Sequence, residues 1–338
     1  MSLRTIAGHR HLLERLARAI AAGTLPPSVI FSGPEGVGKR TAAQAIAQAL
    51  NCERPVEWPS ASAGEPGRDA CGECAACRRI ARGVHADLLI VAPGESGAIK
   101  LDQVREAVER SAYRPFEGRR RVVIVDGADA LIAEAQNALL KTLEEPPPAS
   151  VFVLVTARPD LLLPTVRSRC QRLRFGPLTA PEIAAVLMRD HGFAAADAHA
   201  AAAAADGSIG RALDRDVEHA LAARDAAARL LTSAASGADP RRRLDAARTL
   251  SAGAAERDAL ADRLRALSSL LRDLGALHAH ASDDVLANID LKPVLQSAAR
   301  TFDADRIDGA FAAVDRALAA LDRNASPKIV ADWIALNI

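Results

Sequence analysis

Aromatic residues are scarce in this sequence of 338 residues: they make up 3% of the total, with one tyrosine and two tryptophans. A hydrophobic core must therefore be built from alanine, leucine, valine and isoleucine. Neither sign of charge is in excess, because the formal net charge is +1. This balance excludes a strong global field that would favour nucleic acid or a membrane, so any contact with DNA must be local.

Long hydrophobic runs are missing too. No apolar run is long enough to span a bilayer, and the N-terminus from Met1 to Thr5 lacks the hydrophobic region of a secretory signal. Cysteine is rare, with five residues, but three of them fall within the seven positions 71–77. Such clustering suits a metal site in a reducing cytosol better than disulfides. We therefore expect a cytoplasmic protein without a membrane partner.

The first part of the chain alternates short apolar runs with helical patterns. The runs predict strands over 28–32, 87–92, 121–126, 151–156 and 171–175, and the helical patterns cover 8–22, 41–50, 101–111 and 133–143. Because the strands are short, mostly apolar and separated for the most part by helices, they predict a parallel sheet with helices on both faces. This α/β domain is expected over residues 1–177.

Only helices are expected in the rest of the chain. Thr179 and Glu182 form a capping box that starts the first of them. The alanine-rich run 201–205 is interpreted as a surface helix of high helix propensity. We expect a small helical domain over 178–218 and an all-helical domain over 219–338, and the pattern predicts breaks near 237–240, 282–284 and 324–327.

One stretch, residues 32–41, carries the clearest chemical signal. It reads Ser-Gly-Pro-Glu-Gly-Val-Gly-Lys-Arg-Thr and lies between a predicted strand and a predicted helix, which is the layout of a phosphate-binding loop. Glycines let backbone N–H groups converge on an anion, and the helix N-terminus adds partial positive charge. The alternative is an ordinary glycine turn. The residues expected to hold a nucleotide are Gly33, Gly36, Gly38, Lys39, Thr41 and, from a second motif, Asp126.

Two positions of this nucleotide site depart from the usual pattern. The residue after Lys39 is normally Ser or Thr, whose hydroxyl holds magnesium, but here it is Arg40. The second motif is an apolar strand that ends in Asp126, and the Glu that should follow and polarise water is replaced by Gly127. Asp129 is expected to point away and cap the next helix. Together the two departures predict that the chain does not hydrolyse nucleotide, although Lys39 and the loop amides could still hold a phosphate.

Four cysteines form a second constellation. Cys71, Cys74 and Cys77 follow the x2 spacing within a polar insertion, and Cys52 lies 19 positions before Cys71. Four thiolates complete a tetrahedral zinc site, so we expect structural Zn²⁺; an iron–sulfur cluster and unligated thiols are the alternatives. Residues 53–70 are interpreted as a flexible loop rich in Pro, Ser and Gly. Cys170 is expected in the core, and His85 on the surface.

Arginines form a third constellation, just before the last strand of the first domain. An arginine at the rim of such a sheet can reach a neighbouring subunit's nucleotide, because its fixed charge and forked donors suit a γ-phosphate. Arg167 and Arg169 are the candidates here. The alternative is that both are solvated charges at the rim.

Several of these features occur together in one known family. Segment 137–147, which reads Asn-Ala-Leu-Leu-Lys-Thr-Leu-Glu-Glu-Pro-Pro, resembles a signature of the bacterial DNA polymerase III clamp loader, a member of the AAA+ superfamily. The cysteine insertion, the Ser168-Arg169-Cys170 motif and the helix start at 100–105 are similar to that family as well. The resemblance covers about residues 5–215, and the remainder is similar only to the family's helical collar.

Within this family, the gamma and tau motor subunits carry Lys-Ser or Lys-Thr in the loop and Asp-Glu in the second motif, whereas delta-prime subunits keep the fold with degenerate motifs. Arg40 and Gly127 resemble the delta-prime pattern. So does Gly210, where motor subunits have a nucleotide-sensing arginine; Arg211 lies one residue, about 100°, further around the helix. The loop glycines and Lys39 are better preserved than a fully inactive site requires, which leaves weak nucleotide binding open.

The resemblance implies a delta-prime-like subunit that lends Arg169, as a finger in trans, to the ATP/Mg²⁺ site of an adjacent gamma or tau subunit. It also implies the delta subunit, the sliding clamp and primer–template DNA as partners of the complex, which belongs to a DNA-directed DNA polymerase holoenzyme, a nucleotidyltransferase. The residues that it makes candidates for DNA phosphate contacts are Lys100, Gln103 and Arg105; their alternative role is to line a solvated helix face. The alternative functions are an ATP-hydrolysing motor subunit and a repair-type AAA+ ATPase.

Overall fold

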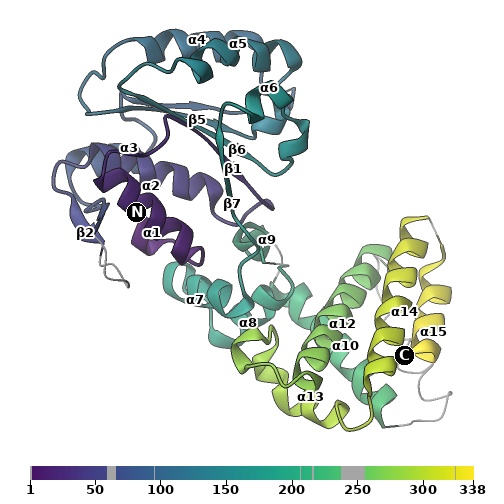
Figure 1. Cartoon of the computed structure of the whole chain (residues 1–338). Coiled ribbons are helices and arrows are strands. Elements are labelled where there is room, and N and C mark those ends of the chain that lie inside the picture. The colour runs from purple at the N-terminus through teal and green to yellow at the C-terminus, as the bar shows by residue number, and fades with distance from the viewer. Residues whose placement is uncertain are drawn as a thin grey trace. The chain divides into compact units, whose positions relative to one another are not determined.

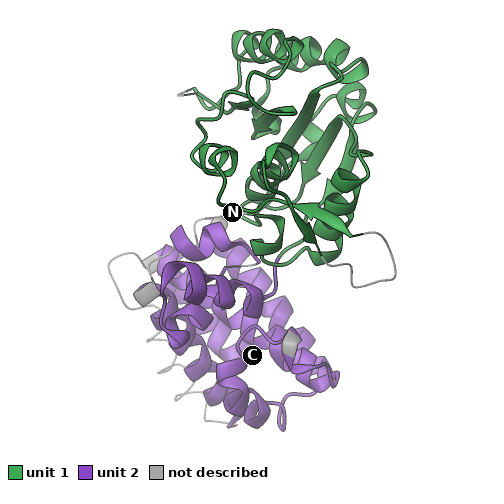
Figure 2. Ribbon diagram, turned by 90° about the vertical axis from the view of Figure 1, so that its left-hand side faces the viewer, with its two compact units in different colours: residues 1–177 green, residues 178–338 purple. Residues whose placement is uncertain are grey.

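The computed structural model describes residues 2–58, 66–94, 96–205, 207–214, 217–236, 256–323 and 325–338. The chain forms two compact units, Met1–Pro177 and Leu178–Ile338, which Figure 2 shows in different colours. The first unit is an α/β domain and the second is entirely helical among its described residues. The division into three domains stays a prediction.

A five-stranded parallel sheet forms the centre of the first unit, as the sequence predicted. The strands lie in the order β4-β5-β6-β1-β7, and their bounds are β1 Ser28–Ser32, β4 Leu88–Val91, β5 Arg121–Asp126, β6 Ser150–Thr156 and β7 Gln171–Arg174. The central strands are buried along almost their whole length. Continuous apolar burial of this kind arises because helices cover both faces of a parallel sheet.

Helices cover the two faces in separate layers (Figure 1). One face packs against α1 (Arg10–Ala21) and α2 (Lys39–Asn51), and the other against α4 (Leu101–Ala112), α5 (Ala133–Glu144) and α6 (Pro164–Arg167). The buried side of α2 consists largely of alanines, and such small side chains let the helix lie close to the sheet. Since α2 begins directly after β1, this packing fixes the position of the intervening loop.

The insertion that carries the cysteines is more ordered than the sequence suggested. A two-stranded antiparallel ribbon, β2 (Val56–Trp58) and β3 (Gly67–Asp69), precedes the short helix α3 (Ala75–Ala81). A Cβ atom on Gly67 would lie 2.8 Å from the side chain of Ala17, so the ribbon packs tightly on α1. The prediction of a flexible loop over 53–70 is therefore wrong at both ends of that segment; residues 59–65 lie outside the described part.

The second unit is built from helices and two short 3-10 turns, Asp283–Val285 and Ile289–Leu291. Its described helices are α7 Ala180–His191, α8 Ala195–Ala203, α9 Ile209–Asp214, α10 Val217–Ala235, α12 Glu256–His278, α13 Lys292–Ala298, α14 Ala304–Asp322 and α15 Pro327–Asn337. The Thr179 capping box forms as predicted, with the Thr179 backbone N–H donating to the Glu182 carboxylate at 2.8 Å. The predicted break at 237–240 lies outside the described residues. No described helix is long and apolar enough to cross a membrane.

The alanine-rich run 201–205 contradicts its surface interpretation. Ala201 and Ala205 are fully buried, and both belong to a small hydrophobic cluster shared by α7, α8 and α9. Alanine has high helix propensity, but it also allows two helices to approach closely. A larger and separate cluster joins α10, α12, α13, α14 and α15. Alanine therefore serves here as a packing residue at a tight helix contact.

Candidate functional site

The predicted phosphate loop lies at the carboxyl end of β1. Gly33 follows this strand with φ 150°, and a Cβ atom there would lie 2.0 Å from the carbonyl oxygen of Phe175. Only glycine fits so close to a neighbouring strand. Gly36 and Gly38 also have positive φ angles, 71° and 94°, and α2 begins at the next residue. The backbone thus has the strand, loop and helix layout that the sequence predicted.

Lys39 is turned onto its own loop. Its side chain is buried, and Nζ donates to the carbonyl oxygens of Gly33 at 2.7 Å and Pro34 at 2.5 Å. Burial lowers the pKa of Lys39, while the carboxylates of Glu35, Asp129 and Asp126 oppose this shift. Burial outweighs these negative charges, so the pKa of Lys39 is lowered overall. An incoming phosphate would have to compete with the two carbonyl groups.

Arg40 contacts the carboxylate that ends β5. Its Nη1 atom lies 3.0 Å from Oδ2 of Asp126, and both side chains are accessible to solvent. The carboxylate expected to act on magnesium is therefore paired with a guanidinium from the same chain. Thr41, the remaining loop candidate, is half-buried in the first turn of α2.

The segment after Asp126 differs from what the sequence suggested. Gly127 has φ 73°, a conformation that a glutamate would adopt only with strain. Asp129 does not cap α5: its carboxylate accepts hydrogen bonds from Thr156 Oγ1 at 2.8 Å and Arg158 Nε at 3.1 Å. Burial raises the pKa of Asp129, but these bonds outweigh it and lower the pKa overall. Thr156 and Arg158 were not singled out from the sequence, because no spacing rule links them to Asp129.

The four predicted cysteine ligands come together. The Sγ atoms of Cys52, Cys71, Cys74 and Cys77 all lie within 4.8 Å of one another. Cys52 Sγ is 3.5 Å from Cys71 Sγ and 3.9 Å from Cys74 Sγ, close to the about 3.8 Å between thiolates that share one tetrahedral zinc ion. The cluster could therefore hold one metal ion.

Backbone groups around the cluster already favour thiolates. The N–H groups of Cys74 and Cys77 donate to the sulfur atoms of Cys71 and Cys74 at 3.3 and 3.4 Å. Burial raises the pKa of Cys74, but hydrogen bonds, chiefly that from Cys77, outweigh it and lower the pKa to about 7. Burial raises the pKa of Cys77 instead. Because its raised pKa makes Cys77 resist ionisation, four thiolates together are unfavourable unless a cation lies among them.

The two other residues discussed with this cluster behave differently. Cys170 is buried in the core beneath α5, as predicted. His85 is also buried, which contradicts its assignment to the surface. Its Nδ1 accepts the backbone N–H of Asp87 at 3.1 Å, and Nε2 lies 3.5 Å from a carboxylate oxygen of Glu117. His85 therefore helps to fix the loop before β4.

Arg169 lies at the opposite end of the sheet from the phosphate loop. It precedes β7, in which Gln171 is level with Val29 near the start of β1, whereas the loop follows the end of β1. Arg169 Nη2 binds Glu144 at 2.9 Å, and Nη1 donates to the carbonyl oxygen of Thr165 at 3.1 Å. The Arg169 side chain keeps 32% of its surface exposed. Because the strands are parallel, Arg169 cannot serve the phosphate loop of its own chain.

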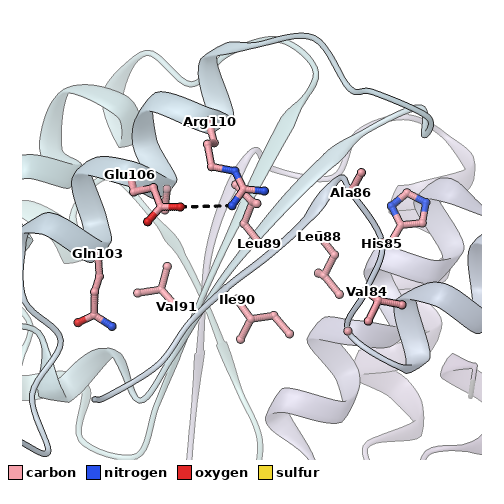
Figure 3. Close-up of a pocket in the computed structure, with 12 residues that line it drawn as sticks. Val84, His85, Ala86, Leu88, Leu89, Ile90, Val91, Gln103, Glu106 and Arg110 are labelled. Carbon is pink, nitrogen blue, oxygen red and sulfur yellow. Dashed lines mark hydrogen bonds and ion pairs between the residues drawn. The ribbon is translucent and has the colours of Figure 1, made fainter. Parts of the chain in front are cut away.

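The three DNA candidates lie at the start of α4 but differ in their contacts. Lys100 and Arg105 are exposed. The Gln103 amide accepts the Lys100 N–H at 2.9 Å and donates to the Ala92 carbonyl at 3.0 Å, so it ties α4 to the end of β4. Gln103 also borders a cavity of about 430 Å³ beside β4, together with the ion-paired Glu106 and Arg110 (Figure 3).

Comparison with known protein families identifies the family to which this chain belongs. Residues 8–179 match the family model described as DNA polymerase III, delta subunit, which is half of the chain. The chain belongs to the DNA polymerase III delta subunit family. The matched residues cover the α/β unit with the phosphate loop, the cysteine cluster and Arg169, and they end where the helical unit begins.

Individual members of this family and its relatives carry more than one subunit name. DNA polymerase III subunit delta' from Pseudomonas aeruginosa is 43% identical over 142 residues, which are 42% of this chain and 40% of that protein. Subunit tau from Bacillus subtilis is 35% identical over 179 residues, 53% of this chain and 30% of that protein. The matched part thus spans less than half the length of these relatives.

Solved structures resemble the chain only loosely over its full length. A DNA polymerase III gamma subunit-related protein from Thermotoga maritima covers 97% of this chain and is itself covered to 98%, with a TM-score of 0.37 and 19% identity. A likeness of this strength carries no information on function.

Proposed function

We propose that the chain is a delta-prime-type subunit of a DNA polymerase III clamp loader, which does not hydrolyse ATP and supplies Arg169 to a neighbouring ATP site. The observation that carries the proposal is the 3.0 Å ion pair between Arg40 and Asp126. In an active site of this type, Asp126 would act on magnesium, and the hydroxyl at position 40 would coordinate it. Here a cation from the chain already neutralises Asp126.

The rest of the loop supports the same proposal. Hydrolysis also requires a group that polarises the attacking water, and the expected position is Gly127. Asp129 is nearby, but it is engaged by Thr156 and Arg158. Lys39 and the loop glycines retain their places, so a phosphate could bind weakly without being turned over.

Arg169 is suited to act on another chain. It lies at the end of the sheet opposite the loop of its own domain, and Glu144 holds its guanidinium group while part of the side chain stays exposed. A preoriented guanidinium loses little freedom when it contacts a γ-phosphate. The adjacent subunit would be a gamma or tau motor subunit that binds ATP and Mg²⁺, and the delta subunit and the sliding clamp complete the assembly.

The cysteine cluster would hold structural zinc. All four positions of a tetrahedron are filled by protein ligands, which leaves no open position for chemistry. The close approach of the four sulfur atoms fits one ion better than a cluster of several iron atoms, whose ligands must stand further apart. The ion would tie the end of α2 to α3 and so fix the insertion against the domain in a cytoplasmic, reducing environment.

Contact with primer–template DNA would involve the start of α4. Lys100 and Arg105 are exposed there and can approach phosphates beside the amides of the helix N-terminus. Gln103 would act indirectly, because its amide already holds Lys100 and Ala92.

A motor subunit is the second candidate, since tau is among the relatives and the loop backbone is intact. A steady-state ATPase assay with Mg²⁺ distinguishes the two functions. The assay is run on the purified chain alone and on its complex with gamma or tau, delta, clamp and primed DNA. We expect background turnover from the chain alone. We also expect Lys39→Ala to leave the turnover of the complex unchanged. Steady turnover by the isolated chain that Lys39→Ala abolishes would identify a motor subunit instead.

A further inference from the structure

A second cavity lies at the amino end of the sheet, away from the phosphate loop. Its volume is about 330 Å³. It is bordered by residues at the starts of three parallel strands, among them Pro27 before β1, Arg120 before β5 and Val151 in β6. The carboxyl ends of α1 and α2 and one residue of β3 complete the wall. None of the residues discussed above as nucleotide, metal or DNA candidates borders it.

Positive charge is concentrated in this cavity. Arg68, Arg119 and Arg120 all border it, and none of the other residues that line it, all within the described part of the chain, is acidic. Arg120 donates through Nη1 to the Pro148 carbonyl, which fixes that guanidinium at the rim. The opposite wall is apolar and includes Ile20, Leu25 and Leu50.

Arg68 is the side chain that indicates a ligand. Its Nε and Nη2 atoms are buried and have no hydrogen-bond partner in the described structure. The residue opposite it in the β2–β3 ribbon is Glu57, but Glu57 is exposed, and no ion pair joins the two among the described residues. A buried donor without a partner is unfavourable, and a guanidinium is more so.

The electrostatic environment of Arg68 adds to this imbalance. Burial lowers the pKa of Arg68, and the nearby charge of Arg119 lowers it further. An anion with several acceptor oxygens in the cavity would neutralise the repulsion between the arginines, and a small turn of the Arg68 side chain would bring its unpartnered N–H groups to those oxygens. Phosphate fits this requirement, because a guanidinium donates to two of its oxygens at once.

We propose that this cavity binds a phosphate group, with the half-buried Arg68 as its main donor and Arg119 and Arg120 at the mouth. The phosphate can belong to a free molecule such as pyrophosphate or a nucleotide, or to the backbone of a nucleic acid strand. The apolar wall accommodates the organic part that carries it. The site is separate from the phosphate loop, so the proposed clamp-loader function stands whether or not this inference holds.

The test measures binding of pyrophosphate to the full-length chain at low ionic strength by calorimetry, in a Lys39→Ala background that removes the phosphate loop's lysine. We expect Arg68→Met, which keeps an apolar stem, to weaken binding about tenfold to a hundredfold, the usual effect of losing a charged hydrogen-bond donor. Arg10→Met is the matched control: Arg10 is exposed on α1, so it loses the same charge outside the cavity and should bind as before.

A second pair of substitutions keeps the test decisive if Arg68→Met does not fold. Arg119→Met combined with Arg120→Met changes only the mouth and should weaken binding several-fold. A single-stranded oligonucleotide that competes with pyrophosphate identifies a nucleic acid backbone as the source, and lack of competition identifies a free phosphate. Absence of pyrophosphate binding, equal binding by Arg68→Met, or loss of zinc rather than of phosphate in Arg68→Met would overturn the proposal.

Discussion

The two ends of the five-stranded sheet use their cations differently. At the carboxyl end, Lys39 and Arg40 bind groups of their own domain: two loop carbonyls and Asp126. At the amino end, Arg169 is held by Glu144 but remains partly exposed, and Nε and Nη2 of Arg68 have no hydrogen-bond partner in the described structure. At the carboxyl end the cations are thus engaged within the domain, whereas at the amino end Arg169 keeps part of its surface exposed and Arg68 keeps buried N–H groups without a partner.

The largest effect is expected from Arg169→Ala. If Arg169 completes the ATP site of a gamma or tau subunit, the substitution should reduce ATP hydrolysis at that one site on the order of 10³-fold, as loss of an arginine finger does. The measurement is DNA-stimulated ATPase in a reconstituted complex with clamp and primed DNA. Arg167→Ala is the control, because Arg167 pairs with Asp160 in the same segment. Equal ATPase activity of the two variants would contradict the finger role of Arg169, and with it the difference proposed between the two ends of the sheet.

The cysteine cluster stabilises the amino end of the sheet, because Cys52 directly follows α2, and α2 ends on that side. Cys74→Ser should abolish metal binding and destabilise the chain on the order of 4 kcal/mol, as loss of a structural metal does. Cys170→Ala is the control, because Cys170 lies in the core and outside the cluster. Metal analysis together with thermal unfolding checks the prediction. About one zinc per chain is expected for the wild type and the control; iron with visible absorbance would contradict the assignment.

Asp87 fixes the same end of the sheet through a buried network. Its carboxylate accepts the backbone N–H groups of Phe116, Glu117 and Gly118 and pairs with Arg121 at 2.8 Å. Burial raises the pKa of Asp87, but these partners outweigh it and lower the pKa to about 2. A lowered pKa stabilises the folded state above the unfolded pKa of about 4, and this contribution is lost as the pH falls towards 2.

Asp87→Asn should therefore cost about 2 kcal/mol of unfolding free energy at neutral pH. It should also flatten the dependence of stability on pH between about 4 and 2. Urea unfolding at a series of pH values measures both. A variant that keeps the wild-type slope in this range would show that other carboxylates determine it.

The sequence predicted the regular part of this architecture well. Strands β1, β4, β5 and β6 have continuous apolar runs, so their positions and the phosphate loop between β1 and α2 followed from local pattern. The β2–β3 ribbon did not, because its strands are short and Gly67 is fixed by contact with Ala17 in a distant helix. Burial of His85 and of the alanine-rich run was missed for the same reason: tertiary contacts decide it.

The same distinction between local pattern and tertiary contact applies to the residues of the candidate site. Cys52, Cys71, Cys74 and Cys77 were recognised by type and spacing, and the structure brings them together. The partners of Asp129, by contrast, come from the end of β6 and the loop after it, which only sheet order places beside it. The roles of Arg169, Lys100 and Arg105 remain predictions, because they depend on other chains.

The smallest effect is expected at the carboxyl end, from Arg40→Thr. This change removes an exposed ion pair, which is worth at most about 1 kcal/mol, and restores a hydroxyl that can coordinate Mg²⁺. Binding of a fluorescent ATP analogue should then strengthen with Mg²⁺, about tenfold or less, whereas the wild type should respond less than about twofold because Arg40 already neutralises Asp126. Lys39→Ala in the same background is the control and should remove the gain.

Turnover separates the two missing parts of the site. Arg40→Thr restores a metal ligand but leaves Gly127 in place, and Asp129 remains bound to Thr156 and Arg158. The position after Asp126 then still lacks a carboxylate to polarise water, so ATP should bind without being hydrolysed. Steady hydrolysis by Arg40→Thr alone would contradict this expectation. It would show that Asp129 can leave its partners and polarise water. The Arg40–Asp126 ion pair would then be what prevents hydrolysis in the wild type, rather than the lack of both a hydroxyl at position 40 and a carboxylate at position 127.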